Sequence, residues 1–365
     1  MANRAAVMTG IESLTVEDRP LRDPAPYEAV VRVESVGVCG SDTAYYTVGR
    51  IGDYVVDGPI ILGHEAAGQV VSVGADVTNV SVGDRVAIEP GTPCRHCHEC
   101  MAGRYHLCPN LVFLATPPYD GALVENIVLD AATLFPIPDT MSYDEGALLE
   151  PLSVGIWACK RAALVPGDDV LVTGSGPVGL LAAAAARAFG AGTVTLTDLA
   201  PFRLDTARAM GFDAERSDEP SDRTFDVLIE CSGAPGVLAA GLERLHEAGR
   251  AAVVGIAKQP VTLPLSTLNP KELTIALVNR YAHTWPIAID LVGSGRIDVA
   301  PWSPTTSPST RPRKPCSWPA PSPTPSRPSS IRSSSSTGRD GRPRAPGGSC
   351  VRAAPYRGAP SGWVR

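Results

Sequence analysis

Residues 170–179 read VLVTGSGPVG, and this stretch decides the fold of the second half of the chain. Its first four residues are apolar and mostly β-branched, which is typical of a buried parallel strand. The next six fit the spacing G-x-G-x-x-G, and the alanine-rich segment 180–189 after them favours a helix. A second strand is predicted at 193–197. It ends at Asp198, about 20 residues past the last glycine, as a dinucleotide fingerprint requires.

Each position of this fingerprint has a physical role. Gly174 permits the tight turn, Gly176 lets the backbone approach a pyrophosphate at the positive end of the helix, and Gly179 lets helix and strand pack closely. Asp198 can accept hydrogen bonds from both ribose hydroxyls and repels a 2′-phosphate, so it favours NAD over NADP. The alternative is a glycine turn in some other α/β domain, but the strands, helix and acid together favour the dinucleotide interpretation.

The 365 residues have room for about two domains with large cores. Residues 1–150 read as short strands punctuated by turns, for example at 29–36, 68–73 and 85–88, and this pattern predicts an irregular β-barrel. Residues 151–285 predict a nucleotide-binding domain.

Within that second domain, strands are predicted at 225–230, 251–255 and 273–278, in alternation with helices. This alternation is typical of a doubly wound parallel sheet.

The composition indicates in which cellular compartment the protein works and which classes of partner it lacks. We expect a cytoplasmic protein, since there is no signal peptide and no long apolar run. Five of the nine cysteines fall between positions 39 and 108, at spacings that suit metal binding better than disulfides. The net charge is −6, but residues 303–365 hold 11 Lys/Arg and one acid, which leaves 21 basic and 37 acidic groups in residues 1–302. An acidic body argues against a nucleic-acid partner, and we expect no membrane partner either.

Four cysteines in one short lobe, residues 91–110, predict a structural zinc site. They are spaced Cys-x2-Cys-x2-Cys-x7-Cys, and four thiolates close a tetrahedral zinc shell with no position left for substrate. The alternative is four unrelated thiols. His96, His98 and His106 lie among them, and we interpret these histidines as solvated loop residues. The four ligands are Cys94, Cys97, Cys100 and Cys108.

A second constellation predicts a catalytic metal. Cys39 with His64 and Glu65 offers a thiolate, an imidazole and a carboxylate, which can hold one zinc and leave a position open for water or an alcohol oxygen. Each residue alone is ambiguous, because a lone histidine is more often structural. Glu150, where the chain leaves the first domain, is a fourth candidate.

Several motifs at matching intervals resemble the zinc-dependent medium-chain dehydrogenases, and within them the sorbitol (L-iditol 2-) and xylitol dehydrogenases. The resemblance runs from about residue 5 to residue 302. It implies a GroES-like irregular β-barrel catalytic domain and a Rossmann domain, with residues 286–302 beginning the return to the catalytic domain. The motifs are CGSD at 39–42, GHEA at 63–66, GDRV at 83–86, EPLSVG at 150–155, the cysteine lobe and the glycine fingerprint.

The resemblance also implies residue roles. Cys39, His64 and Glu65 would hold the catalytic zinc, and Glu150 would bond to the zinc-bound water or exchange with it as a ligand. Ser41 would relay a proton. The polyol site would be lined by Tyr45, Thr116, Glu150, Arg280 and Tyr281. The NAD site would comprise Gly174, Gly176, Pro177, Val178, Gly179 and Asp198, with Arg203 at the adenosine end.

The implied reaction is oxidation of a polyol secondary alcohol to a ketose, with hydride transfer to NAD and two zinc ions per chain. A homotetramer or homodimer is expected. One alternative is another secondary-alcohol enzyme of the family, such as a threonine or butanediol dehydrogenase. A second alternative is an inactive remnant that still binds zinc or NAD.

The composition breaks at Ser303, after which Ser, Pro and Arg dominate. Read literally, residues 303–365 are a disordered, irregular basic tail, either a linker or an arm for an acidic partner or a nucleic acid. We favour a third interpretation, a frameshift near Pro301–Trp302. With one base restored, 302–315 can read LVTHHFPLDEAEEA and 324–330 can read DAIKAVI, which resemble the closing helix and strand of this family.

Overall fold

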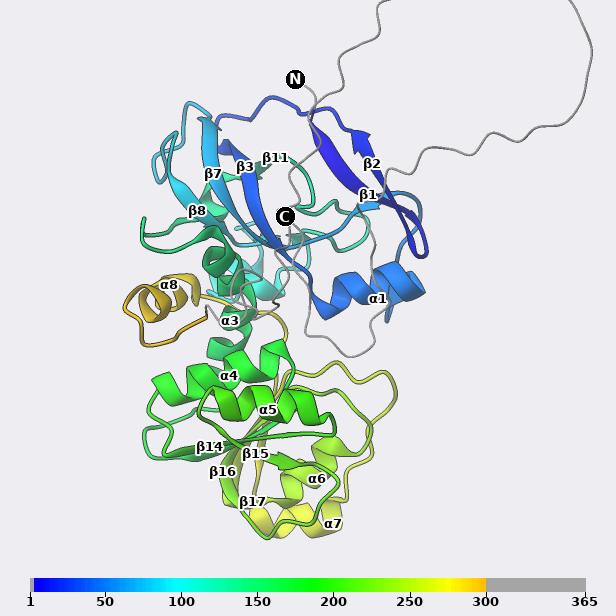
Figure 1. The fold of residues 1–365 in the computed structure, drawn as a ribbon, viewed down its shortest axis with the longest axis vertical. Coiled ribbons are helices and arrows are strands. Elements are labelled where there is room, and N and C mark those ends of the chain that lie inside the picture. Colours follow the sequence, from blue (N-terminus) through cyan, green and yellow to red (C-terminus); the bar gives the residue numbers. More distant parts are fainter. Residues whose placement is uncertain (1–2, 300–365) are drawn as a thin grey trace, which may run out of the picture.

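The computed structural model describes residues 3–299, which form two lobes joined by one long helix (Figure 1). This helix, α3 (Tyr143–Arg161), lies between a strand-rich lobe and an α/β lobe. It begins with a capping box, in which Ser142 Oγ accepts from the Glu145 N–H and Glu145 Oε2 accepts from the Ser142 N–H. Because α3 packs on β7 of the first lobe and on α4 of the second, it fixes where the two lobes meet.

The strand-rich lobe is built on a five-stranded antiparallel sheet with the order β11-β3-β7-β8-β12. The sheet buries small and branched apolar side chains, among them Val31, Val70 and Ile88. Gly68 is required in it, because a Cβ atom there would lie 2.1 Å from the Arg32 carbonyl oxygen. The strands are β3 (Glu28–Gly37), β7 (Glu65–Val73), β8 (Arg85–Ile88), β11 (Asn126–Asp130) and β12 (Leu134–Pro136).

Smaller elements complete this lobe. A three-stranded sheet has the order β2-β1-β6, and two-stranded ribbons pair β4 with β5 and β9 with β10. These strands are β1 (Arg4–Gly10), β2 (Ser13–Asp18), β4 (Arg50–Ile51), β5 (Tyr54–Val55), β6 (Ile60–Ile61), β9 (Gly91–Thr92) and β10 (Val112–Phe113). The helices are α1 (Gly40–Val48), α2 (His98–Met101), η1 (Tyr105–Leu107) and η2 (Ala131–Thr133).

The second lobe is a six-stranded parallel sheet with the order β15-β14-β13-β16-β17-β18. Its first strand in sequence lies in the middle and the chain winds outward in both directions, which is the predicted doubly wound order. The strands are β13 (Asp169–Thr173), β14 (Thr193–Asp198), β15 (Asp213–Arg216), β16 (Phe225–Glu230), β17 (Leu245–Val253) and β18 (Thr274–Leu277). The helices α4 (Pro177–Ala188) and α5 (Pro201–Ala209) cover one face, and α6 (Val237–Glu243) and α7 (Leu265–Leu268) the other (Figure 1). The 3-10 helix η3 (Asn269–Lys271) follows α7.

The predicted strands of this lobe agree with the structure where the sequence of the strand is continuously apolar. Strands predicted at 170–173, 193–197 and 225–230 coincide with β13, β14 and β16 to within a residue. The prediction at 251–255 was six residues late at its start, because β17 begins with the polar stretch after Leu245. The edge strand β15 was missed, since its sequence DAER carries no apolar alternation. The predicted boundary between residues 150 and 151 lies inside α3, which continues through Pro151.

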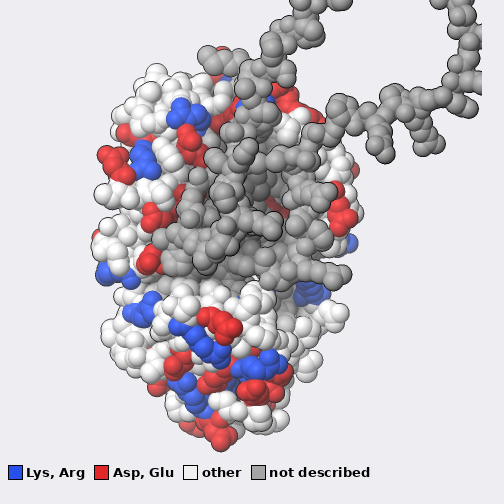
Figure 2. Space-filling view, in the orientation of Figure 1, with Lys and Arg blue, Asp and Glu red and all other residues white. Residues whose placement is uncertain are grey.

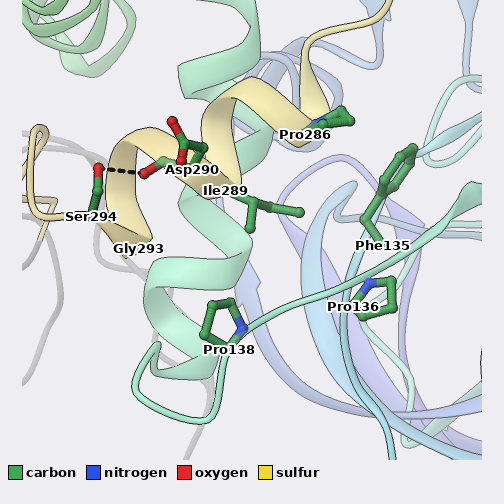
Figure 3. A pocket seen from close by; sticks show the side chains of 8 residues that line it. All are labelled: Phe135, Pro136, Pro138, Pro286, Ile289, Asp290, Gly293 and Ser294. Carbon is green, nitrogen blue, oxygen red and sulfur yellow. Dashed lines mark hydrogen bonds between the residues drawn. The ribbon is translucent and has the colours of Figure 1, made fainter.

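The last described helix, α8 (Trp285–Gly293), packs back onto α3 and the strand-rich lobe. The Trp285 ring stacks on Phe135 of β12 at 5.4 Å between centroids. Between α8 and β12 lies an apolar groove of about 620 Å³ (Figure 3). Its lining is Phe135, Pro136, Pro138, Pro286, Ile289, Asp290, Gly293 and Ser294. Its one carboxylate, Asp290, pairs with Arg296 at 2.6 Å, so the groove offers no group suited to catalysis.

Charges on the α/β lobe are mixed. On the face in Figure 2, Lys and Arg are interspersed with Asp and Glu over this lobe. Some form a small network, in which Glu215 pairs with Arg223 at 3.3 Å and with Arg244 at 3.0 Å. Among residues 3–299, no helix is both long and apolar enough to cross a membrane. The predicted tail, residues 303–365, lies outside the described residues.

Candidate active site

The structure brings Cys39, His64 and Glu65 together where α1 and β7 begin. Their ligand atoms all lie within 4.8 Å of one another. Cys39 precedes α1, and Glu65 opens β7 opposite Gly37 of β3, so strand pairing brings together residues that are distant in sequence. A sulfur, an imidazole nitrogen and a carboxylate oxygen in one cluster form a donor set that fits zinc.

The protonation of this cluster shows why it fits a cation. Burial, and then the negative charge of Glu150, raise the pKa of Glu65 to about 8. Burial also raises the pKa of the Cys39 thiol. For His64, burial lowers the pKa, but the charges of Asp42 and Cys39 outweigh it and leave the pKa well above its ordinary value. Without a metal these pKa shifts favour the protonated forms, and a divalent cation displaces such protons when it binds.

Asp42 accepts hydrogen bonds from the backbone beside both Cys39 and His64, and it was not predicted as a site residue. Its Oδ2 accepts from the Cys39 N–H at 3.0 Å, and its Oδ1 accepts from the Gly63 N–H at 2.9 Å. His64 Nδ1 lies 3.7 Å from the same Oδ1. The sequence did offer a sign of this role, because Asp42 is an acid three residues after Cys39. An acid at that position of a helix can accept a hydrogen bond from the N–H of the residue that caps the helix.

Glu150 and Tyr281, two of the residues predicted to line the substrate site, contact each other. The Tyr281 hydroxyl donates to Glu150 Oε1 at 2.8 Å, and both side chains are buried. Burial raises the pKa of Glu150, which His64 and Tyr281 partly offset. The pair joins α3 to the segment after β18, so it forms only when the two lobes are in place.

The other predicted substrate residues lie at different distances from this centre. Tyr45 is buried in α1, and burial raises the pKa of its phenol. The Arg280 guanidinium lies 4.4 Å from the ring centroid of Phe113, which in turn lies 5.7 Å from that of His64. Phe113 was not predicted as a site residue, since a lone aromatic carries no distinguishing pattern.

Ser41 and Thr116 are positioned by local structure. Ser41 lies in the first turn of α1, two residues after Cys39. Thr116 lies in the loop after β10, where its N–H donates to the Phe113 carbonyl at 3.1 Å. Both are partly buried, and their roles stay predictions.

The four lobe cysteines also converge. Their sulfurs all lie within 4.8 Å of one another, with Cys97 at 3.4 Å from Cys100 and 3.9 Å from Cys108. Burial and neighbouring thiols raise the pKa of Cys100 to about 12, and bound zinc would replace that proton. This arrangement fits the closed tetrahedral site that the spacing predicts.

The interpretation of His106 as a solvated residue was wrong. His96 and His98 are exposed, but His106 is 6% exposed and its ring meets Trp157 edge-on at 5.1 Å. Burial lowers the pKa of His106 to about 4. The residue sits in the 3-10 helix η1, which turns its side chain inward against α3, a tertiary contact that loop composition does not reveal.

The glycine fingerprint adopts the expected turn between β13 and α4. Gly174 has φ +89°, and a Cβ on Gly179 would lie 1.8 Å from the Gly174 carbonyl oxygen. A Cβ on Gly176 would meet nothing within 4 Å, so open space lies where a pyrophosphate would approach. Pro177 is the first residue of α4, with Val178 next. This helix N-terminus therefore fits a dinucleotide.

Asp198 ends β14 beside this turn. It accepts from the Ser175 and Ala200 N–H groups, each at 2.9 Å, and Arg203 Nη1 lies 3.3 Å from it. A carboxylate has about four acceptor positions, so the ribose hydroxyls can still bind. Arg203 thus pairs with Asp198 here, and its contact with the adenosine end stays a prediction.

Comparison with known proteins agrees with this geometry. Residues 25–139 match the model of the alcohol dehydrogenase GroES-like domain, and residues 177–294 match that of the zinc-binding dehydrogenase domain. The sorbitol dehydrogenase of Bacillus subtilis (strain 168) is 46% identical over 310 residues, 81% of this chain and 87% of that protein. The chain belongs to the zinc-binding dehydrogenases.

Solved structures of such dehydrogenases share the fold. L-idonate 5-dehydrogenase from Escherichia coli superposes with a TM-score of 0.77 at 27% identity, covering 82% of this chain and 89% of that one. 2R,3R-butanediol dehydrogenase from Bacillus subtilis has a TM-score of 0.74 at 29% identity, covering 81% and 90%. The predicted GroES-like and Rossmann fold, and zinc and a nicotinamide dinucleotide as cofactors of this zinc-binding dehydrogenase, are thereby confirmed.

Proposed function

We propose that this chain oxidises a secondary hydroxyl of a polyol to a ketone, with NAD as hydride acceptor. The observation that carries the proposal is the Cys39–His64–Glu65 cluster beside the buried Tyr281–Glu150 hydrogen bond. The cluster offers candidate metal ligands, and the Tyr281–Glu150 pair offers further hydrogen-bonding groups for a substrate. The similarity to a sorbitol dehydrogenase supports a polyol as the substrate class.

Each residue of the site would have a separate role in the reaction. A zinc ion held by Cys39, His64 and Glu65 would supply Lewis acidity that lowers the pKa of a substrate hydroxyl. Ser41, two residues after Cys39, would take up the hydroxyl proton and pass it toward solvent or the NAD ribose. Tyr281 holds the Glu150 carboxylate in place, so that Glu150 can accept a hydrogen bond from the reacting group or from water.

Substrate and cofactor selection follow from charge and hydrogen bonding. Tyr45, Thr116, Arg280 and Tyr281 would pair with the further hydroxyls of a polyol, and a site built to bond several hydroxyls rejects simple alcohols. Asp198 would bind the ribose of NAD and repel the 2′-phosphate of NADP.

A second candidate is oxidation of a smaller secondary alcohol, such as 2,3-butanediol or threonine. The similarity in fold to a 2R,3R-butanediol dehydrogenase supports this second candidate. The buried carboxylate–phenol pair beside Arg280 favours the polyol, because it offers more hydrogen-bonding groups than a small alcohol can satisfy.

We also infer a homodimer or homotetramer in the cytoplasm. β18 is the edge strand of the six-stranded sheet, and Leu277 on it is 73% exposed, which favours pairing with a second copy. The cysteines of residues 3–299 form no disulfides, as suits a reducing compartment. Light scattering of the purified protein measures the assembly.

A substrate panel tests the activity. Initial rates would be measured on sorbitol, xylitol, threonine and 2,3-butanediol, each with NAD and NADP, for the full chain and for Cys39→Ala and His64→Ala. We expect preference for a polyol with NAD, and loss of turnover in both variants. Preference for threonine or butanediol, or turnover that survives both substitutions, would contradict the proposal. Zinc and NADH binding without turnover on any substrate would support the inactive-remnant alternative.

A further inference from the structure

A small cavity lies where three parts of the chain meet, beside the proposed catalytic centre. Its volume is about 10 Å³, close to the minimum that one water molecule needs. One wall comes from the segment after β8, a second from the cysteine lobe and β10, and a third from the segment after β18. The lining residues are Glu89, Gly91, Tyr105, His106, Leu111, Phe113, Arg280 and Tyr281.

The polar groups around this cavity have hydrogen-bonding capacity that protein atoms do not meet. Glu89 is a carboxylate only 7% exposed, and the Tyr105 hydroxyl and the Trp285 indole N–H lie near it. Within residues 3–299, neither Trp285 Nε1 nor His106 Nδ1 has a hydrogen-bond partner. Buried polar atoms without partners are costly, and a bridging water is the usual remedy when the groups stand too far apart for a direct bond.

Tyr105 adds a donor to this set. Its hydroxyl oxygen accepts from the His283 N–H at 3.0 Å, so its own proton is free to donate toward the carboxylate or a water. A water needs two to four polar partners, and Glu89, Tyr105 and His106 supply them on one side of the cavity.

The other side of the cavity reaches the catalytic carboxylate. Tyr281 lines the cavity and donates to Glu150 Oε1 at 2.8 Å. A hydroxyl that donates one hydrogen bond retains acceptor positions, so a water in the cavity can donate to Tyr281 Oη. Such a bond strengthens the tyrosine as a donor, since hydrogen bonds in a chain polarise one another.

We propose that this cavity binds one internal water molecule, and that Glu89, through this water and Tyr281, is a positioning residue for Glu150. The placement of the water is independent of the reaction. The catalytic consequence rests on the proposed function, in which Glu150 serves the reacting group.

Several charged and polar groups face the Glu89 carboxyl and shift its pKa. Burial raises the pKa of Glu89 to about 7, and Glu150 raises it further while Tyr105 and Trp285 oppose the shift. Tyr281 and Arg280 face it from the segment after β18, and His106 from η1.

The test compares the full chain with Glu89→Gln, which keeps the shape and removes the charge. A high-resolution crystal structure of the unchanged protein should show one water within hydrogen-bonding distance of Glu89 and Tyr281. In Glu89→Gln we expect the water and the Glu150 side chain to shift. We expect kcat to fall about tenfold, as for other groups that act through a neighbour.

The kinetic pattern distinguishes positioning from loss of structure. Because Glu89 does not touch substrate, KM for the polyol should stay unchanged while kcat falls. Zinc content should remain at two per chain. Tyr105→Phe removes one hydroxyl partner and provides a milder second variant if Glu89→Gln does not fold.

Glu28→Gln is the matched control, because Glu28 is 8% exposed at the start of β3 and pairs with Arg22 away from the site. It should leave the kinetics unchanged. A dry cavity in the unchanged protein would overturn the water site. An unmoved Glu150 with an unchanged kcat in Glu89→Gln would overturn the positioning role. If the unchanged protein turns over no polyol, the proposed function fails, while the two crystal structures still test this inference.

Discussion

At the scale of single residues, the two glycines that flank the cofactor turn have separable roles. Gly176 opens onto empty space, whereas a Cβ on Gly179 would overlap the Gly174 carbonyl oxygen. Both glycines belong to one sequence motif, and only the structure shows which serves packing and which leaves space for a ligand.

We therefore expect Gly176→Ala to fold with a free energy of unfolding within about 0.5 kcal/mol of the original, because nothing lies near the new methyl group. NADH binding should weaken about tenfold or more, a loss of about 1.4 kcal/mol. Gly179→Ala should instead lose about 1–3 kcal/mol of stability through overpacking. Urea denaturation and NADH fluorescence titration measure the two effects. Equal effects of both substitutions on stability would contradict this division.

Asp42 provides a second prediction. Its two carboxylate oxygens accept from the Cys39 and Gly63 N–H groups, and asparagine has only one oxygen for these two donors. Asp42→Asn should weaken zinc binding at the Cys39–His64–Glu65 cluster by about 10- to 100-fold.

The measurement is zinc content after dialysis against a chelator, which should fall from two per chain toward one. Asp57→Asn, at an exposed position in the same lobe, is the control and should retain both ions. Full zinc retention by Asp42→Asn would show that the bracing is dispensable.

At the scale of elements, the cysteine lobe connects to the seam between the two lobes of the molecule. His283 Nε2 lies 2.8 Å from the Gly103 carbonyl oxygen, and the Tyr105 and His283 rings meet edge-on at 5.1 Å. A zinc ion that orders the cysteine lobe would therefore also support the segment that carries Arg280 and Tyr281.

Cys97→Ser should remove one zinc per chain and lower the melting temperature by about 5 °C or more, because the lobe loses the metal that would hold its four sulfurs together. Zinc analysis and calorimetry measure both. Cys231→Ala, which changes a thiol outside either cluster, should keep two zinc ions. A Cys97→Ser protein with two zinc ions would show that this is not a closed four-thiolate site.

Elements with strong apolar patterns were predicted well, and those without were not. β13 and β16 are buried runs, and such runs have few alternatives to a central strand. β15 and the inward turn of η1 depend on neighbours rather than on local pattern. The long helix α3 runs across the predicted domain boundary, because Pro151 removes one N–H from its ladder without ending it.

At the scale of the whole molecule, α8 and β12 present an apolar groove, and the chain continues from α8 into residues 300–365 outside the described part (Figure 3). The match to the zinc-binding dehydrogenase domain ends at residue 294. The frameshift interpretation of the tail stays a prediction, and it concerns a site near residues 301–302, a few residues after this match ends.

Sequencing the gene across codons 300–304 tests it, and we expect one missing base. A frame-restored protein should melt at a higher temperature and aggregate less than the chain as written, because a closing helix and strand would cover apolar surface. An unambiguous gene sequence with no insertion or deletion relative to close relatives would contradict the interpretation. Identical melting temperatures of the two proteins would also contradict it.

The amino-acid sequence by itself determined the fold class, and it indicated the four-cysteine lobe, the candidate metal triad and the cofactor fingerprint. In each of these the chemistry requires particular residue types at short, fixed spacings. Only the tertiary structure decided the bracing by Asp42, the burial of His106 and the cavity at Glu89. Those features join residues from separate elements, and their partners are set by how the lobes pack rather than by any local pattern.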